Sequence, residues 1–373
     1  MSTLKVDTIT DSSSGLTTTI NGFTPNIGNM RGRNLVINGH MLIAQRGTGA
    51  FTDNNGFSVD RWKNISNTTD FSVQQSSVVP SGQEFTKSVH VTPTATKTHN
   101  SGDYFFISHY VEGYNIGGLG YGTSGAKTIT VSFWVRSSKT GTYSLGMKNA
   151  NASRSRQNEY TISVADTWEK KTIVVPGETT GSWPIDNTRG IAFDFCLAGQ
   201  ATATSSVNTW LSNNSNMSTN QVNFFDNTNN NFYLTGVQVE VGSEATDFDY
   251  RSYGEELSLC QRYFQIFGSK GSTGTNGDIF PGFYRNSSQV FVPVTLPVTM
   301  RTTPSFTAIS NSGAQFSSQT QDTPITSFAI SNTPTPRTAF VVANSSAAFA
   351  AGNGIVYTNN GSTADAFSFS AEL

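Results

Sequence analysis

The sequence predicts an all-β protein with an N-terminal attachment segment, an antiparallel jelly-roll sandwich, a short linking helix and a smaller C-terminal β-sandwich domain. Three observations lead to this fold class. About ten short segments rich in β-branched and aromatic residues follow one another, each bounded by Gly, Asn, Asp, Ser or Pro. No helical pattern separates them, which disfavours a parallel α/β sheet. Only residues 255–265 carry apolar side chains at helical spacing.

Residues 1–33 form the first piece. Their few apolar side chains, among them Leu4, Val6 and Ile9 and then Leu16, Ile20 and Phe23, lie in a Ser/Thr/Gly background and cannot build a core that offsets the entropy of ordering the chain. This segment is therefore expected to dock on something else, and a frayed tail is the alternative. The first ten residues lack the basic and apolar regions of a secretory signal, and no segment reaches the ~20 apolar residues of a membrane span. We expect neither export by a cleaved peptide nor membrane insertion.

Residues 34–252 are predicted to form the jelly roll. The first apolar stretch, NLVINGHMLIAQRG at 34–47, is taken as strand material. Alternation is strong at 128–136, where Phe133 and Val135 predict an inward face and Trp134 falls on the other face. The Asn-rich stretch 200–230 predicts a long functional or mobile loop. Further strands are predicted at 70–78, 87–93, 104–111, 127–138, 142–149, 159–164, 168–177, 191–199 and 231–242.

Residues 253–267 are predicted to form the linking helix. Leu257, Cys260, Tyr263 and Phe264 share one face, and acidic residues precede a basic one, as a helix dipole favours. Two interpretations stay open: a joint between two β domains, or a helix that closes one end of the sandwich. Residues 268–373 predict the second, smaller β domain from further short strands and turns.

Composition excludes several classes of function. Charged residues make up 13% of the chain, about half the usual share, so Ser, Thr, Asn and Gln must supply most of the polar surface. A net charge of -2 gives no electrostatic attraction to nucleic acid. Cys196 and Cys260 are too few for a disulfide framework and lack metal-ligand spacing, so both are predicted to be buried thiols. We expect no metal and no cofactor.

No catalytic motif stands out. The four histidines fall in no metal or nucleophile pattern, and the glycines at 117–122 lack the strand and helix of a phosphate-binding loop. Glycosidases need two carboxylates about 5–10 Å apart, and the sequence cannot pair any two of its candidates. Asp226 is equally a turn former or a calcium ligand. The carboxylates considered are Asp186, Asp194, Asp226, Glu240, Glu244, Asp247 and Asp249.

Aromatic residues offer a better indication. Sugars lay their apolar faces on exposed aromatic rings while amides and hydroxyls bind the sugar hydroxyls, and this chain is rich in both groups. Trp62, Trp134 and Trp168 lie in or beside strand patterns and are predicted to be core. The predicted ligand-binding residues are the loop tryptophans Trp183 and Trp210, followed by Tyr121, Phe280 and Tyr284.

Several motifs together resemble a family of bacteriophage tail-fibre and related virion fibre proteins. These are NLVINGHMLIAQRG, SVDRW, TITVSFWVRSS, WEKKTIVVPG, FYLTGVQVEVGSEATDFDYRSYGEELSLCQRYFQ and LPVTMRTTP; the opening MSTLKVDTIT is also similar to the start of many fibre chains. The resemblance covers most of residues 1–305. It supplies no catalytic motif and no fixed set of ligand positions.

The resemblance implies an architecture and a role. The expected protein is a homotrimeric virion fibre, assembled in the host cytoplasm, that binds other virion proteins through residues 1–33 and forms its body from a carbohydrate-binding-like sandwich. Its distal C-terminal domain, residues 268–373, is expected to contact host-surface glycan. Tail and capsid attachment both stay open. The alternatives are a capsid head fibre or decoration protein, and a tailspike-like polysaccharide depolymerase. The depolymerase is disfavoured because no regular solenoid period is present.

Overall fold

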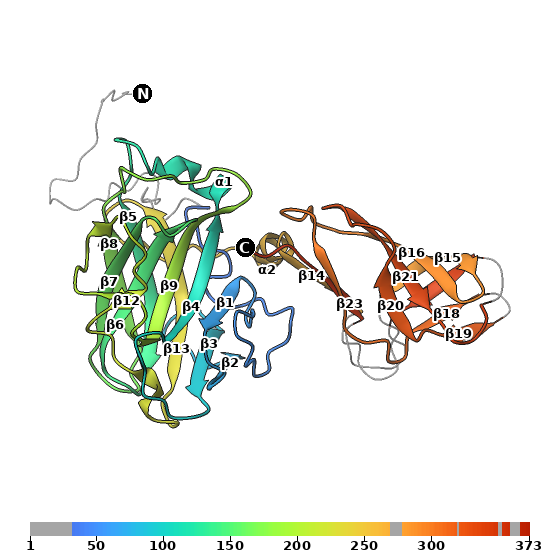
Figure 1. Ribbon diagram of the computed structural model, residues 1–373, viewed down its shortest axis with the longest axis horizontal. Coiled ribbons are helices and arrows are strands. Elements are labelled where there is room, and N and C mark those ends of the chain that lie inside the picture. The colour runs from blue at the N-terminus through green and yellow to red at the C-terminus, as the bar shows by residue number, and fades with distance from the viewer. Residues whose placement is uncertain (1–31, 269–277, 319–320, 350–352, 359–365) are drawn as a thin grey trace, which may run out of the picture.

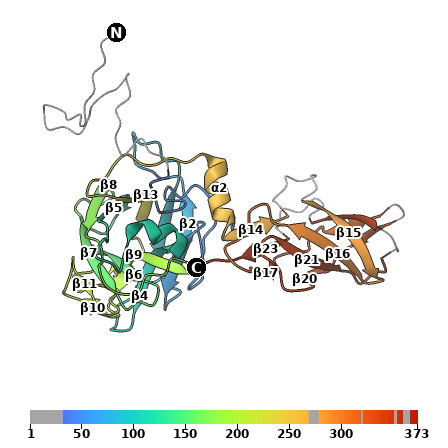
Figure 2. The same cartoon turned by 90° about the horizontal axis from the view of Figure 1, so that it is seen from above.

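The computed structural model describes residues 32–268, 278–318, 321–349, 353–358 and 366–373. Two β-rich parts lie side by side, and both views place helix α2 (Tyr253–Gln261) and the C-terminal end of the chain between them (Figures 1 and 2). The predicted all-β fold, with antiparallel sheets and one short linking helix, is confirmed. The attachment segment 1–33 lies outside the described residues except for Gly32 and Arg33.

The larger part is a sandwich of two antiparallel sheets. One sheet has the order β1 (Trp62–Ser66), β4 (Tyr104–Glu112), β9 (Arg189–Gly199), β6 (Gly141–Asn149), β7 (Ser155–Ile162) and β11 (Trp210–Leu211). The other has the order β2 (Phe71–Ser76), β3 (Ser88–Pro93), β13 (Phe232–Val241), β5 (Ile129–Ser137) and β8 (Glu169–Val175). The loop after β9 folds back as a parallel pair, β10 (Ala203–Thr204) and β12 (Met217–Ser218). One-turn helices complete this part: α1 (Gly113–Ile116), η2 (Gly117–Leu119) and η3 (Phe224–Asp226).

Alternation along the strands builds the core between the two sheets. On β5, the side chains of Val131, Phe133 and Val135 are fully buried. The alternate residues Trp134 and Arg136 are partly exposed on the outer face. All nine strands expected between residues 70 and 242 are present with small shifts at their ends. The predicted buried thiols are confirmed, since Cys196 and Cys260 are both free and buried.

Segment 34–47, expected as strand material, is instead irregular. Asn38 and Met41 adopt positive φ values of 58° and 60°, which no strand tolerates. Hydrogen bonds of the buried Asn38 side chain take the place of the hydrogen bonds between neighbouring strands. Its Nδ2 donates to the carbonyls of Ile43 and Asp60 at 2.8 and 2.9 Å, and its Oδ1 accepts from the Ile43 N–H. Buried apolar side chains are thus supported by side-chain hydrogen bonds rather than by a neighbouring strand.

The linking helix is shorter than predicted. Ser252 caps α2, the helix ends at Gln261, and residues 264–267 form strand β14 (Phe264–Phe267), which pairs with β23 (Phe367–Ser370). The helical spacing of apolar residues predicted too long a helix, because Tyr263 and Phe264 are buried even though they lie beyond its end. The buried Cys260 and Tyr263 pack against Ile37 and Ile43 of the sandwich. The helix therefore closes the sandwich and joins it to the next domain, so both interpretations hold.

The C-terminal part contains two further sheets among the described residues. A three-stranded sheet has the order β14, β23 and β17 (Ser305–Ala308). A seven-stranded sheet has the order β19 (Asp322–Pro324), β18 (Gln315–Ser317), β22 (Asn353–Tyr357), β15 (Ile279–Asn286), β16 (Gln289–Thr295), β21 (Thr338–Asn344) and β20 (Ser327–Ile330). Phenylalanines from both sheets, including Phe316, Phe328, Phe367 and Phe369, fill the core between them.

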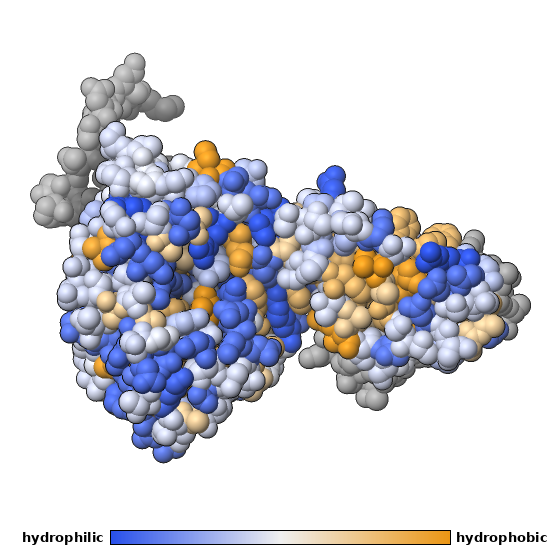
Figure 3. All heavy atoms as spheres, viewed as in Figure 1, coloured by the Kyte–Doolittle hydropathy of each residue, from blue (hydrophilic) through white to orange (hydrophobic). Residues whose placement is uncertain are grey.

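The outer face of the seven-stranded sheet is largely apolar. Val290, Val292 and Val341 point into the core, so the alternate positions on the same strands point outward. The exposed large hydrophobic side chains on this face are Ile279, Phe283, Phe340 and Ile355, with exposed fractions of 37–55%. Figure 3 also shows orange atoms gathered on the C-terminal domain, over the region that Figure 1 labels β20, β21 and β23. Exposed apolar side chains gathered on one face make that face a candidate surface for association.

Candidate functional site: an aromatic groove on the five-stranded sheet

A groove of about 370 Å³ lies on the outer face of the five-stranded sheet. Its floor comes from β5, β8 and β13, and its walls come from the loops at 82–85 and 246–250. The groove is lined by Gly82, Gln83, Glu84, Phe85, Ser132, Trp134, Lys170, Gly236, Thr246, Asp247, Phe248 and Tyr250.

Strand alternation and register place the floor. Trp134 lies beside Lys170 on β8 and beside Thr235 on β13, so the indole ring stands on the outer face with a cation next to it. At Gly236, where the register of β13 shifts, φ is +62°, and a β-carbon would stand 2.6 Å from the Phe85 ring. The missing side chain at this bulge makes room for Phe85 to lie against the sheet.

Aromatic rings build one wall of the groove. The Phe85 and Phe248 ring centroids are 5.2 Å apart and those of Phe248 and Tyr250 are 4.8 Å apart, both pairs being within the range of favourable ring contacts. His40 packs behind them, with its centroid 5.6 Å from that of Phe248. Burial, with a smaller contribution from the Arg251 charge, lowers the pKa of His40 to about 4. His40 is thus neutral at pH 7.

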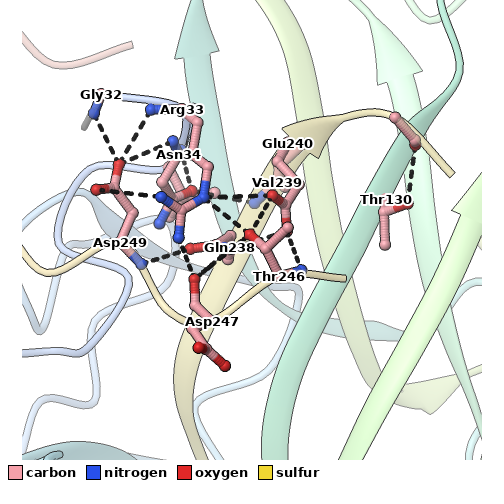
Figure 4. Close-up of polar contacts among 12 residues, drawn as sticks. Gly32, Arg33, Asn34, Thr130, Gln238, Val239, Glu240, Thr246, Asp247 and Asp249 are labelled. Carbon is pink, nitrogen blue, oxygen red and sulfur yellow. Dashed lines mark hydrogen bonds and ion pairs between the residues drawn. The ribbon is translucent and has the colours of Figure 1, made fainter. Parts of the chain in front are cut away.

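A buried polar network holds the loop that carries Thr246 and Asp247 (Figure 4). The Arg33 guanidinium donates from Nε to the Thr246 hydroxyl at 2.9 Å and forms ion pairs with Glu240 at 3.4 Å and with Asp249 at 3.9 Å. Asp249 in turn accepts the backbone N–H groups of Gly32 and Arg33 at 2.9 and 3.0 Å. The network therefore fixes one wall of the groove and the point at which residues 1–31 join the sandwich.

The lining of the groove suits a polyhydroxylated ligand. Trp134 and Tyr250 offer partly exposed rings to the apolar face of a sugar. Around them stand the hydroxyls of Ser132 and Thr246, together with Gln83, Glu84, Lys170 and Asp247, which supply hydrogen-bond donors and acceptors. Among the described residues, no group of three or more His, Cys, Asp or Glu side chains is arranged to hold a metal ion.

Three of the predicted ligand-binding residues come together elsewhere. Ring centroids of Tyr121 and Trp183 are 4.9 Å apart, those of Trp183 and Trp210 are 5.6 Å apart, and those of Tyr121 and Trp210 are 6.0 Å apart. Tyr121 and Trp183 are only 7% and 8% exposed, while Trp210 is partly exposed. Both indoles donate to backbone carbonyls, of Thr180 at 3.0 Å and of Pro176 at 2.9 Å. Their role in binding stays a prediction, with little ring surface open to a ligand.

The two predicted residues in the C-terminal domain lie apart from this cluster. Phe280 packs into the domain core, with its ring 5.9 Å from those of Phe267 and Phe367. Tyr284 is 37% exposed on β15. Neither residue lies in the groove, and their role in ligand binding stays a prediction as well.

Several candidate carboxylates are committed to structural partners. Asp194 forms an ion pair with Lys148 at 3.2 Å and accepts from Ser108 at 2.7 Å. Asp226 pairs with Lys139 at 2.5 Å. Hydrogen bonds from the Thr188 hydroxyl and backbone N–H lower the pKa of Asp186. Each of these carboxylates has a hydrogen-bond or ion-pair partner within the protein, which suits a structural role.

The groove residues were not predicted, because tryptophans in or beside strand patterns were expected to be buried. Of the three tryptophans predicted to be core, Trp62 is fully buried, but Trp134 and Trp168 are partly exposed. Alternation at 128–136 already placed Trp134 opposite the inward residues, so that signal was available. The loop residues Phe85 and Tyr250 carried no comparable signal, since only the fold brings them to β5.

No family model and no curated protein sequence matches this chain. Among solved structures, similar chains include the enzymatically active domain of tailspike protein 4 from bacteriophage CBA120, with 13% identity and a TM-score of 0.31 over 56% of this chain and 22% of that one. A putative sugar-binding protein from Bacteroides thetaiotaomicron has 10% identity and a TM-score of 0.31 over 56% of this chain and all of that one. A xylan-binding domain from Paenibacillus barcinonensis has 9% identity and a TM-score of 0.27 over 54% and 99%. At these scores the likenesses do not indicate what this chain binds.

Proposed function

We propose that this protein is a structural fibre of a bacteriophage virion, a non-catalytic homotrimer that recognises host-surface glycan through the aromatic groove. The observation that carries glycan recognition is the groove itself, where Trp134 and Tyr250 stand among hydroxyl, amide and charged groups. The structural pairing of Asp186, Asp194 and Asp226 supports a role without catalysis.

Trimerisation is supported by the outer face of the seven-stranded sheet. Phe340 on this face is 47% exposed, and its ring centroid lies 6.1 Å from that of Phe291 on the neighbouring strand. Arg285 lies over the Phe291 ring, with its guanidinium 4.8 Å from the ring centroid. Three copies of this face gathered around a three-fold axis would remove its apolar surface from water, which is the main driving force for association.

The virion role is supported by the motifs quoted above and by the anchored start of the sandwich. Asp249 and the Arg33 network hold the chain at Gly32, so residues 1–31 join the body at a fixed place. Removing residues 1–31 keeps Arg33 and its contacts with Thr246, Glu240 and Asp249. The shortened chain is expected to fold and trimerise but to be missing from virus particles. Particles that incorporate it normally would refute attachment through this segment.

The groove is tested by binding of the full-length protein to an array of bacterial surface glycans. Trp134→Ala is expected to weaken binding by at least about tenfold, which corresponds to losing roughly 1.4 kcal/mol of ring contact. Trp210→Ala is the matched control, because its ring lies in the other cluster, and it is expected to bind like the parent. The reverse result would move the site to the Tyr121, Trp183 and Trp210 cluster.

Two further measurements separate the alternatives. Release of reducing ends from capsular polysaccharide or lipopolysaccharide would indicate a depolymerase and contradict a non-catalytic fibre.

Labelled antibody against the C-terminal domain, imaged on intact particles, distinguishes a tail fibre from a capsid head fibre or decoration protein. We place the fibre on the tail.

A further inference from the structure

An amine, an amide and a carboxylate meet on the outer face of the six-stranded sheet. Lys148 projects from β6 and Asp194 from the neighbouring strand β9, on which Asp194 stands directly beside Gly146 of β6. Asn216 comes from the loop after β9, immediately before β12. Lys148 Nζ donates to Asn216 Oδ1 at 2.5 Å and lies 3.2 Å from Asp194 Oδ2. The amine therefore contacts a primary amide and a carboxylate at the same time.

Hydrogen bonds hold the amide in this position. Gln157 Nε2 on β7 donates to the Ser215 carbonyl at 2.7 Å, and the Ser218 N–H donates to the Ser144 hydroxyl at 2.9 Å. These contacts fasten the chain to the sheet on both sides of Asn216. Groups that the fold holds in contact in this way react with the large rate advantage of an intramolecular step.

The amine and the carboxylate are largely shielded from water. The Lys148 and Asp194 side chains are 11% and 5% exposed. The Phe106 ring centroid lies 5.4 Å from Nζ, and Phe106 belongs to a buried cluster with Cys196 and Met217. Separated charges are costly in such surroundings. Transfer of one proton from Nζ to the carboxylate leaves two neutral groups, one of which is a nucleophilic amine.

We propose that Lys148 and Asn216 join in an intramolecular isopeptide bond, with Asp194 carrying the protons. Asp194 takes one proton from the Lys148 ammonium, and the free amine attacks Cγ of Asn216. Asp194 then gives its proton to Nδ2 and takes the second proton from Nζ, and the bond between Cγ and Nδ2 breaks. Ammonia leaves with the proton that remains on Asp194. One ammonium and one primary amide thus become one secondary amide and one ammonium ion, and no oxidant or other reagent is consumed.

The bond forms once in each chain, so it is separate from glycan recognition and does not require the groove to bind a ligand. The two joined positions are 68 residues apart. A covalent link over that distance restricts the unfolded chain as a disulfide does, and it fastens the loop after β9 to the sheet. Because it is an amide, reducing agents do not cleave it.

A second lysine supplies a matched control. Lys139 Nζ lies 2.5 Å from Asp226, and Asn230 Nδ2 donates to the same carboxylate at 2.9 Å. Here the Asn230 Oδ1 accepts from the Ser138 hydroxyl at 3.5 Å. The Lys139 and Asp226 side chains are 34% and 41% exposed, so water solvates both charges. These residues have the same chemical types as the proposed set, and they are expected to stay unlinked.

The test is mass spectrometry of the full-length protein. Its mass is expected to be lower, by one ammonia, than the mass of its sequence. Trypsin does not cut after a lysine whose amine is acylated, so peptide 140–154 is expected to be joined to peptide 190–251. Fragmentation of the joined pair should place the link at Lys148 and Asn216.

Variants assign the role of each residue. Lys148→Arg and Asn216→Ala are each expected to abolish the joined peptide and to restore the full mass, whereas Lys139→Arg is expected to leave both unchanged. Asp194→Asn keeps both joined residues and is expected to reduce the linked fraction at least about tenfold, as the loss of a general acid and base does. The digest of the parent protein decides the outcome if a variant fails to fold.

Two results would overturn the proposal. In the first, the digest of the parent yields a separate peptide that ends at Lys148 and no joined peptide. A loss of ammonia without the joined peptide counts with this result, because an Asn–Gly pair that forms a succinimide loses the same mass. In the second, the joined peptide persists undiminished in Asp194→Asn, which would exclude Asp194 as the carrier of the protons.

Discussion

Single residues decide how this sandwich presents its outer surface. Trp134 is exposed because it alternates with Phe133 and Val135, and Phe85 reaches the sheet because Gly236 has no side chain. His40 is buried behind the groove wall, only 4% exposed, with its ring against Phe248. The shape of the groove therefore depends on buried groups that do not line it.

The protonation of His40 is expected to destabilise the protein in acid. Its folded pKa is about 4 and its unfolded pKa is 6.5, so the unfolded chain takes up the proton first as the pH falls. The contribution of neutral His40 to the free energy of unfolding is fully present above pH 6.5. It decreases by roughly 3 kcal/mol as the pH falls to 4, at 1.36 kcal/mol per pKa unit.

Urea unfolding at pH 7 and pH 4 checks this expectation. His40→Gln removes the titrating group while keeping a polar side chain, so it should lose less stability than the parent between the two pH values. Equal losses in the parent and the variant would show that His40 does not titrate in this window.

Two structural elements shape the molecule: the bulge in β13 shapes the groove, and the joint that contains α2 connects the sandwich to the C-terminal domain. The bulge turns the backbone at Gly236 and opens space for the loop at 82–85. The joint combines α2 with Glu372 near the C-terminus, whose carboxylate bridges Arg46 and Arg61 of the sandwich. Arg61 also lies over the Tyr263 ring at 3.5 Å.

Gly236→Ala is expected to damage both stability and binding. The new β-carbon would lie 2.6 Å from Phe85, in addition to the left-handed strain of about 1–2 kcal/mol for a non-glycine residue. Gly242→Ala is the control, because Gly242 also has a positive φ, of +127°, with open space around it, and does not line the groove. Thermal unfolding and glycan binding should both be more strongly impaired in Gly236→Ala. Equal effects would show that the contact with Phe85 is unimportant.

Glu372→Ala is expected to weaken the joint. The Arg61 side chain is 1% exposed and would lose its carboxylate partner, and breaking such a buried pair costs about 3–5 kcal/mol. Lys139→Ala serves as the control, since the Lys139 and Asp226 side chains are 34% and 41% exposed and such a pair contributes about 1 kcal/mol or less. Urea unfolding of the full chain measures both. A loss no larger than that of the control would contradict a structural role for Glu372.

At the scale of the whole molecule, the sandwich and the C-terminal domain present different surfaces. The sandwich covers its tryptophan cluster and offers a groove rich in polar groups. The C-terminal domain leaves apolar side chains on the outer face of its seven-stranded sheet. In the proposed trimer, the C-terminal domains pack against one another and the grooves of the three sandwiches remain open.

Phe340→Asp is expected to convert the trimer to monomer, because it places a charge on the apolar face that copies would share. Tyr114→Asp is the control: Tyr114 is 63% exposed, on α1 of the sandwich. Sedimentation equilibrium gives the mass of each variant. A trimer that persists in Phe340→Asp would exclude this face as the contact between copies.

Local patterns in the chain are enough to predict the fold class and most of the strands. Alternation places Phe133 inward whatever the rest of the chain does, and the cap at Ser252 with the acidic residues after it begins α2 locally. The burial of Cys196 and Cys260 follows equally from residue type. These properties need no knowledge of distant contacts.

Only the tertiary structure decided the conformation of 34–47 and the location of the groove. Segment 34–47 has the apolar content of a strand, but Asn38 binds the backbone at Ile43 and Asp60 and holds it irregular. Likewise, the groove joins loops at 82–85 and 246–250 across β5. Such arrangements depend on hydrogen bonds and packing between residues far apart in the chain, and those contacts leave no periodicity in the sequence.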